Sequence, residues 1–311
     1  MQKKLGLISV AAVSLLAACN GAQEDEATET NEPVEIEEGN GGFLWKVEHG
    51  DTEVYLQGTI HVGREDFYPL NPQTEDAYDA ADVVLPEVDL VNADISAFET
   101  MMTDRALLAD DTTLDELISD EAYEQLEAIL TDNGVPVELF QGFEPWFVEN
   151  MLFAFTIQDS DVEESAGVEE YFLSRAVEDE KEIRELESIE AQFDVLSGFS
   201  METQVQMLEN SLATFDEADE ELEAMADMWV DGDTEGLESL WDELEDSDVD
   251  NEYAYELNEV RNEDMASTID EILQEDSGQT YFVIVGSMHL VAEPSIVSIL
   301  EEEGYTVNFI Y

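Results

Sequence analysis

The sequence predicts an α/β or α+β fold, in which a mixed β-sheet core is combined with a large helical middle region. Alternating apolar residues on either side of the turn-forming Gly50-Asp51 indicate an N-terminal β-hairpin. Residues 280–311 read as strand, helix and strand, which indicates a C-terminal βαβ unit with a right-handed crossover. Between them, residues of about 93–178 and 190–275 follow helical periodicity. These two segments are therefore expected as helical insertions in one domain.

The elements follow in order. After the hairpin, residues 73–81 suit a helix, and the apolar run at 83–88 suits a strand, at an edge or with a bulge because Pro86 cannot donate a hydrogen bond. A helix is expected from Ser119 to the stop signal at Gly134. Residues 183–186 then read as a short strand. The expected C-terminal unit comprises a strand at 280–286, a helix at 294–303 and a strand at 305–311.

Composition describes a folded but very acidic protein. The chain has 311 residues, 44% of them hydrophobic, and 80 acidic residues against nine basic ones give a net charge of −71. Such a surface repels nucleic acids and anionic lipids. Because no acidic cluster stands out, a surface adapted to high salt is favoured over a cation-binding polyanion.

The first residues resemble a bacterial lipoprotein signal. Lys3 and Lys4 precede an uncharged, mostly apolar run at 5–16, which is too short to span a bilayer, and the segment ends in Leu-Ala-Ala-Cys19. We expect a signal peptide at 1–18, lipidation of Cys19, and an acidic disordered tether at 19–42, with the folded domain at 43–311. The protein would then be extracytoplasmic and held to the cell membrane by lipid alone. The alternative is an incidental cysteine in a cleaved signal.

Two of the three histidines occur in the same G-x-x-H spacing, at 58–61 and 286–289, and each motif follows an apolar run. The composition predicts fewer such matches by chance. The glycine permits a tight turn or a close backbone approach before each histidine. The third histidine, His49, adjoins the hairpin turn and is expected to be a solvated turn residue.

Four side chains are expected just past the ends of strands: His61, Glu87, Glu187 and His289. Such strand ends can converge at the ligand-binding edge of an α/β sheet. Two imidazoles and a carboxylate suit a divalent transition metal, and His61, His289 and Glu87 form the predicted ligand set. The competing interpretations are packed or capping histidines and surface acids.

Arg261 interrupts an apolar stripe that recurs every fourth residue: Tyr253, Leu257, Arg261, Met265, Ile269 and Leu273. A charge in this position must be paired or lie at the rim of a polar site. Glu187 or a substrate carboxylate could be its partner. A snorkelling arginine with a solvated head is the other interpretation.

Taken together, several motifs resemble the TraB/PrgY/GumN family, to which the Tiki proteases are related. They are GTIHVG at 58–63, Tyr68-Pro69-Leu70, Glu87 in PEVDL, ELESIEAQ at 185–192, Arg261-Asn262 with Met265, and VGSMHLV at 285–291. The resemblance covers residues 43 to 311 and implies an α/β core shared with haem-binding and erythromycin-esterase-like relatives. One departure is Ser287-Met288, where smaller residues are expected, and it narrows the space beside His289.

By this resemblance, His61, His289 and Glu87 correspond to a metal-dependent peptide-cleaving site, and PrgY-like members restrain peptide pheromones. The sequence thus predicts a lipid-anchored metal-dependent hydrolase acting on peptides, with Mn, Co or Zn as the cofactor. Glu87 or Glu187 would serve as ligand or general base, and Arg261 would orient an anionic substrate end, with Asn262 beside it in the catalytic set. The alternatives are a non-catalytic binder of a peptide or haem-like ligand, and a metal-independent esterase that uses a histidine and a glutamate.

Overall fold

The computed structural model describes residues 42–109, 111–245 and 251–311. Within them, one mixed sheet has the strand order β4-β3-β5-β2-β1-β6. The strands are β1 (Phe43–His49), β2 (Thr52–Thr59), β3 (Val83–Pro86), β4 (Glu182–Ile183), β5 (Thr280–Gly286) and β6 (Val307–Phe309). The predicted mixed α/β architecture is therefore confirmed. The predicted signal peptide, Cys19 and nearly all of the tether lie outside the described residues.

The sheet combines an antiparallel hairpin with a parallel half. β1 pairs antiparallel with β2, and β2, β5, β3 and β4 are joined by parallel pairings. Since β6 pairs antiparallel with β1, it runs parallel to β5, which confirms the strand–helix–strand order of the C-terminal unit. The edge or bulge expected for β3 is wrong, because β3 lies between β4 and β5 and its residues 83–86 pair in unbroken register with 281–284 of β5. Pro86 ends β3, beyond the two residues of the strand that pair with β4.

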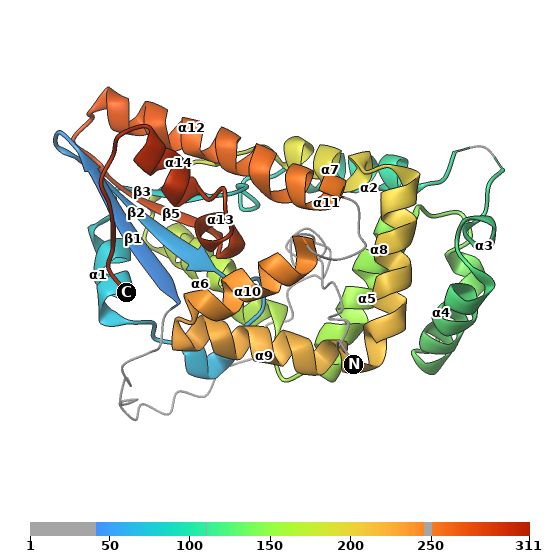
Figure 1. The fold of residues 1–311 in the computed structure, drawn as a ribbon. Coiled ribbons are helices and arrows are strands. Elements are labelled where there is room, and N and C mark those ends of the chain that lie inside the picture. Colours follow the sequence, from blue (N-terminus) through green and yellow to red (C-terminus); the bar gives the residue numbers. More distant parts are fainter. Residues whose placement is uncertain (1–41, 110, 246–250) are drawn as a thin grey trace.

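The helices connect the strands along the chain, and in space they lie beside the sheet and beyond one end of it (Figure 1). Their helices are α1 (Pro72–Ala80), α2 (Ile95–Ala106), α3 (Leu114–Leu117), α4 (Asp120–Asp132), α5 (Pro145–Asp159), α6 (Val168–Glu178), α7 (Ile189–Gly198), α8 (Met201–Thr214), α9 (Ala218–Asp231), α10 (Thr234–Glu245), α11 (Asn251–Ala254), α12 (Val260–Glu275), α13 (Met288–Val291) and α14 (Ile296–Glu302). A π-helical turn, Tyr255–Glu259, directly precedes α12. Figure 1 shows that α3, α4, α5 and α8 form an end of the molecule away from the sheet.

The core surrounds β5, whose residues from Tyr281 to Val285 are all buried. On one face of this strand, Phe282 packs against Tyr78 of α1 and Phe172 of α6. A continuous apolar strand buried on both faces is typical of a parallel sheet covered by helices. This packing fixes the sheet edge from which the motif residues emerge.

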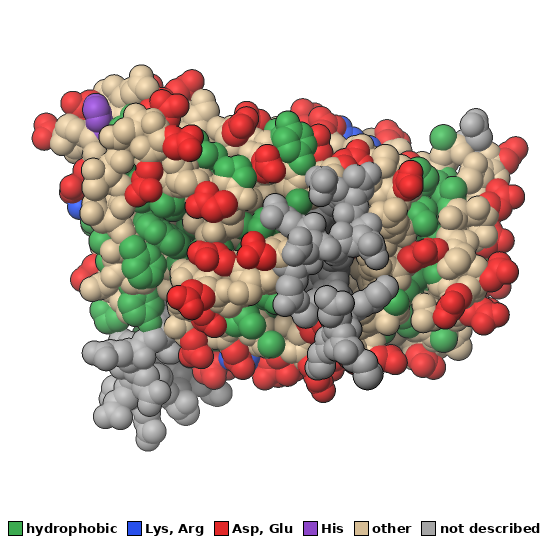
Figure 2. Space-filling model, in the orientation of Figure 1, with side chains coloured by type: hydrophobic (Ala, Val, Ile, Leu, Met, Phe, Trp, Pro, Cys, Tyr) green, Lys and Arg blue, Asp and Glu red, His purple; other side chains and the backbone are tan. Residues whose placement is uncertain are grey.

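The distribution of acidic side chains on the surface agrees with the acidic composition of the sequence. Figure 2 shows acidic side chains over the whole visible face rather than in one cluster. Within the described residues, none of the helices has the length and apolarity needed to cross a membrane.

Candidate functional site

The two G-x-x-H motifs leave the sheet side by side. β2 and β5 are parallel neighbours in which Thr59 pairs with Gly286, so both histidines follow the same edge of the sheet. Gly58 lies inside β2 and Gly286 ends β5, and neither has a positive φ. Of the two roles considered for these glycines, close approach fits Gly58, because a Cβ there would lie 2.8 Å from Ser287 Oγ.

Ser287, the unusual residue of the second motif, faces the neighbouring strand. Its backbone N–H and its hydroxyl both donate to the Thr59 carbonyl, at 3.0 and 2.9 Å. The missing side chain of Gly58 makes room for it. Ser287 therefore fits where a smaller residue was expected, and its hydrogen bonds to the Thr59 carbonyl connect the two motifs.

Glu87 and Glu187 meet because their backbones pair beyond the short strand β4. Leu186 N–H donates to the Pro86 carbonyl at 3.0 Å, and Glu187 N–H donates to the Glu87 carbonyl at 2.9 Å. This register brings the two carboxylates to one point. Arg261, from α12, lies between them.

The Arg261 guanidinium binds both carboxylates. Its Nη2 contacts Glu87 Oε2 at 2.5 Å and also Glu187 Oε1, while Nε donates to both Glu187 oxygens at 3.1 Å. Nη1 donates to the Leu257 carbonyl at 3.4 Å. With only 5% of the residue exposed, Arg261 does not snorkel. Glu187, one of the two expected partners, is therefore confirmed, and Glu87 is a second one.

Gln192 is a residue that the sequence interpretation quoted in a motif but gave no role. From α7, its amide Nε2 donates to Glu87 Oε2 at 3.1 Å and to Glu187 Oε1 at 2.8 Å. The sequence feature that could have identified Gln192 is its position, one turn into the helix that follows Glu187. Gln192 and Arg261 together satisfy oxygens of both buried acids.

Glu87 stays ionised in this setting. Burial is the largest single influence and would raise the pKa of Glu87, but the Arg261 charge, the two histidines and the Gly286 N–H together outweigh it and lower the pKa to about 2. The Gly286 N–H donates to Glu87 Oε1 at 2.7 Å. A carboxylate with so low a pKa is a weak proton acceptor at neutral pH.

His289 lies beside Glu87 as a neutral imidazole. Its Nδ1 contacts Asn262 Oδ1 at 2.7 Å, while the amide nitrogen of Asn262 donates to the Pro294 carbonyl at 2.7 Å, which fixes the orientation of the amide. The oxygen can only accept, so Nδ1 carries the proton. His289 Nε2 then faces Glu87 Oε1 at 3.8 Å. Burial and the Arg261 charge lower the pKa of His289 to about 3.

His61 has an acidic partner that the sequence interpretation missed. Its Nδ1 lies 3.2 Å from Glu169 Oε1, on α6. Burial alone would lower the pKa of His61, but Glu169 and then Glu87 reverse this and raise it. His49, in contrast, is exposed at the end of β1 and contacts the Tyr305 ring, as a turn residue outside the site.

The predicted metal ligands are brought to one edge but not into a three-ligand set. Among the residues that the structure describes, no group of three or more His, Cys, Asp and Glu side chains could hold a metal ion. Glu87 Oε2 accepts from Arg261 and Gln192, and Glu87 Oε1 accepts from the Gly286 N–H. Each of the two histidines has its Nδ1 beside a side-chain oxygen, an arrangement that is typical of metal-binding histidines.

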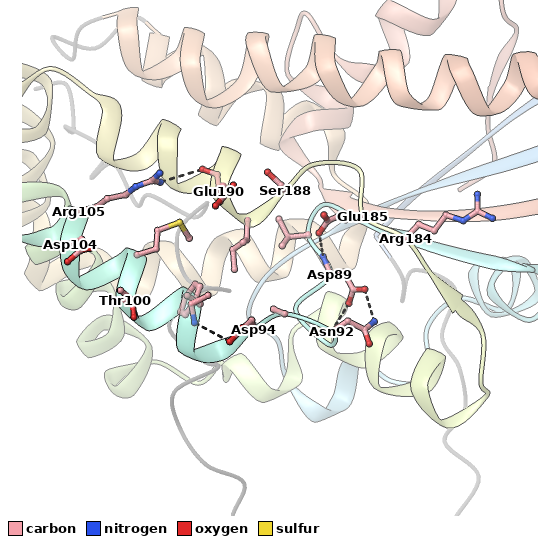
Figure 3. Close-up of a pocket in the computed structure, with 16 residues that line it drawn as sticks. Asp89, Asn92, Asp94, Thr100, Asp104, Arg105, Arg184, Glu185, Ser188 and Glu190 are labelled. Carbon is pink, nitrogen blue, oxygen red and sulfur yellow. Dashed lines mark hydrogen bonds between the residues drawn. The ribbon is translucent and has the colours of Figure 1, made fainter.

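A groove of about 960 Å³ lies between α2 and the start of α7 (Figure 3). Its lining includes Val88 and Ser188, which follow Glu87 and Glu187 in the sequence, but neither of these two glutamates. The buried Phe98 also lines the groove, and the other lining residues include Asp89, Asp94, Asp104, Glu185, Glu190, Arg105 and Arg184. Both arginines have acidic partners, Asp194 and Glu182, so the groove presents an excess of negative charge.

Comparisons with known proteins agree with the motifs. The model of the TraB/PrgY/gumN family matches residues 43–308. An uncharacterized protein of Treponema pallidum is 25% identical over 173 residues, which are 55% of this chain and 51% of that protein. The uncharacterized protein YbaP of Escherichia coli and that of Shigella flexneri are each 28% identical over 147 residues, 47% of this chain and 53% of each relative. The chain thus spans about half the length of these curated relatives. No solved structure matches significantly.

Proposed function

Because the chain belongs to the TraB/PrgY/gumN family, we propose that this sheet edge is the active site of a metal-dependent hydrolase that acts on peptides. The observation that carries the proposal is the hydrogen bonding of the two motif histidines. In both, Nδ1 is held by a side-chain oxygen, of Glu169 for His61 and of Asn262 for His289. Such contacts orient Nε2 for binding a cation.

His61 and His289 would hold the ion, which would be Mn²⁺, Co²⁺ or Zn²⁺. When bound, a divalent ion lowers the pKa of a coordinated water and polarises the scissile carbonyl. Glu87, ionised beside His289, would accept a hydrogen bond from water and hold it in place. Arg261 and Gln192 keep Glu87 and Glu187 fixed, and this holds the negative charge at a constant position.

The same proposal places the protein outside the cytoplasm, anchored to the membrane through lipidated Cys19. It is supported by the signal-like residues that precede this cysteine. Cys19→Ser should move the protein from the membrane fraction to the soluble fraction. Unchanged fractionation of that variant would remove the anchor from the proposal.

The groove between α2 and the start of α7 favours a second candidate, a peptide-binding protein without catalysis. Its apolar lining residues and its excess of acidic side chains suit a peptide with apolar and basic residues. In this candidate, the imidazole pair would contribute nothing to binding.

The test is metal binding measured beside peptide cleavage. The acidic surface holds cations loosely, so the titration is run in high salt with sub-stoichiometric to equimolar Mn²⁺, Co²⁺ or Zn²⁺. Wild type should bind about one ion tightly, while His61→Ala and His289→Ala should each lose it together with cleavage. His49→Ala is the matched control, because His49 is the remaining histidine and is exposed.

The other outcomes separate the candidates. Tight binding that persists in His61→Ala/His289→Ala would refute the cation site. Hydrolysis of an ester substrate that survives removal of all metal would leave the metal-independent esterase, and peptide binding by an inactive, metal-free wild type would leave the binding protein.

A further inference from the structure

The loop that carries His61 is pressed against the start of α6 through two glycines. Gly63 and Glu163 exchange backbone hydrogen bonds at 3.0 and 2.8 Å, and Val168 N–H donates to the Ile60 carbonyl at 3.0 Å. A Cβ on Gly63 would lie 2.1 Å from the Ala166 carbonyl oxygen, and one on Gly167 would lie 2.3 Å from that of His61. No side chain fits at either position, so glycine permits this backbone contact.

The contact brings Glu169, in the first turn of α6, to the imidazole. Glu169 Oε1 lies 3.2 Å from His61 Nδ1, and the Thr59 hydroxyl donates to the same oxygen. A carboxylate oxygen can only accept here, so Nδ1 of His61 carries the proton. In the neutral imidazole, the lone pair then belongs to Nε2.

The second carboxylate oxygen argues against a purely structural role. Glu169 Oε2 is buried and has no hydrogen-bond partner among the described residues, although 16% of the side chain is exposed. An unsatisfied buried oxygen lowers the stability of the fold. Local features that cost stability are expected at functional sites, where the same group serves another purpose.

We propose that Glu169 is the positioning residue of His61, which fixes its tautomer and ring orientation for binding a cation. The inference rests on the proposed function, and it assigns to Glu169 no contact with substrate. Asn262 serves His289 in the corresponding way, so the two imidazoles would be oriented by one carboxylate and one amide.

The test uses Glu169→Met, which keeps the approximate size of the side chain and removes the acceptor. Cation affinity should fall about 10- to 100-fold, as expected for loss of an outer-shell partner. Nitrogen NMR of the His61 ring should show a mixture of tautomers in place of the Nδ1–H form. The thermal transition should stay close to that of wild type, because losing the unpartnered oxygen offsets the lost hydrogen bonds.

Four further variants sharpen the result. Glu169→Gln keeps a neutral acceptor and should restore the tautomer and part of the affinity. Gly167→Ala, which displaces α6 from His61, should lower the affinity with the carboxylate still present, whereas Gly198→Ala, where a Cβ meets nothing within 4 Å, should not. Glu170→Gln changes the neighbouring exposed acid and should behave as wild type.

Unchanged tautomer and affinity in Glu169→Met would overturn the proposal, as would a variant that loses its fold, because that shows a structural role. If wild type itself binds no cation, the proposed function fails, and the ring NMR of the metal-free protein still decides whether Glu169 fixes His61.

Discussion

Arg261 shows most clearly how one residue can be anticipated from the sequence while its partners cannot. The spacing of the α12 stripe placed a charge among buried positions, and the structure confirms that Arg261 and Met265 are buried there. One of its partners, Glu187, was among those expected. Glu87 as a second partner was not, because that contact depends on β3 lying beside β5 and on the pairing of residues 186 and 187 with 86 and 87.

Replacing Arg261 by Met should destabilise the protein by about 3–5 kcal/mol at neutral pH, because two buried carboxylates would lose their cation. Without the Arg261 charge, burial would raise the pKa of Glu87 above its unfolded value, so the variant should regain stability as the pH falls from 7 toward 4.5. In wild type, Glu87 has a pKa of about 2, and its contribution is lost only as the pH falls from about 4.5 to 2. Denaturant unfolding at several pH values measures both curves.

Two comparisons show whether the buried charges cause this effect. Arg184→Met removes a half-exposed arginine that pairs with the exposed Glu182, and the change in stability should stay within about 1 kcal/mol. Adding Glu87→Gln and Glu187→Gln to Arg261→Met should restore much of the lost stability and remove the pH dependence. A pH-independent loss in the single variant would show that packing, not charge, is responsible.

At the scale of elements, the site depends on where strands end. The sequence indicated that apolar strands deliver His61, Glu87 and His289, and the parallel pairing of β2, β5 and β3 brings their ends to one edge. The role of the glycines was less predictable. A G-x-x-H spacing cannot show that Gly58 is needed for Ser287, or that Gly63 and Gly167 bring α6 onto the loop, since both are contacts between distant segments.

Residues that position others were the hardest to predict. Gln192 and Glu169 lie on helices, and in a chain with 80 acidic residues a single glutamate carries almost no signal. Their importance comes from hydrogen bonds at the sheet edge, which depend on tertiary packing. The fold class, by contrast, follows from local periodicity, and most predicted helices and strands lie close to their expected positions.

For the whole molecule, the acidic surface should make stability depend on salt. Mutual repulsion among the acidic side chains opposes the compact state, and the screening length shrinks from about 10 Å at 0.1 M to about 3 Å at 1 M salt. The melting temperature should therefore rise from low to molar NaCl.

A variant with Glu124→Gln, Glu127→Gln and Asp132→Asn neutralises three exposed acids of α4, one of them at the helix end where a negative charge is unfavourable. It should melt higher than wild type at low salt and gain less from added NaCl. If wild type melts at the same temperature at low and molar NaCl, surface repulsion does not limit its stability, and the interpretation of the surface as adapted to high salt is wrong.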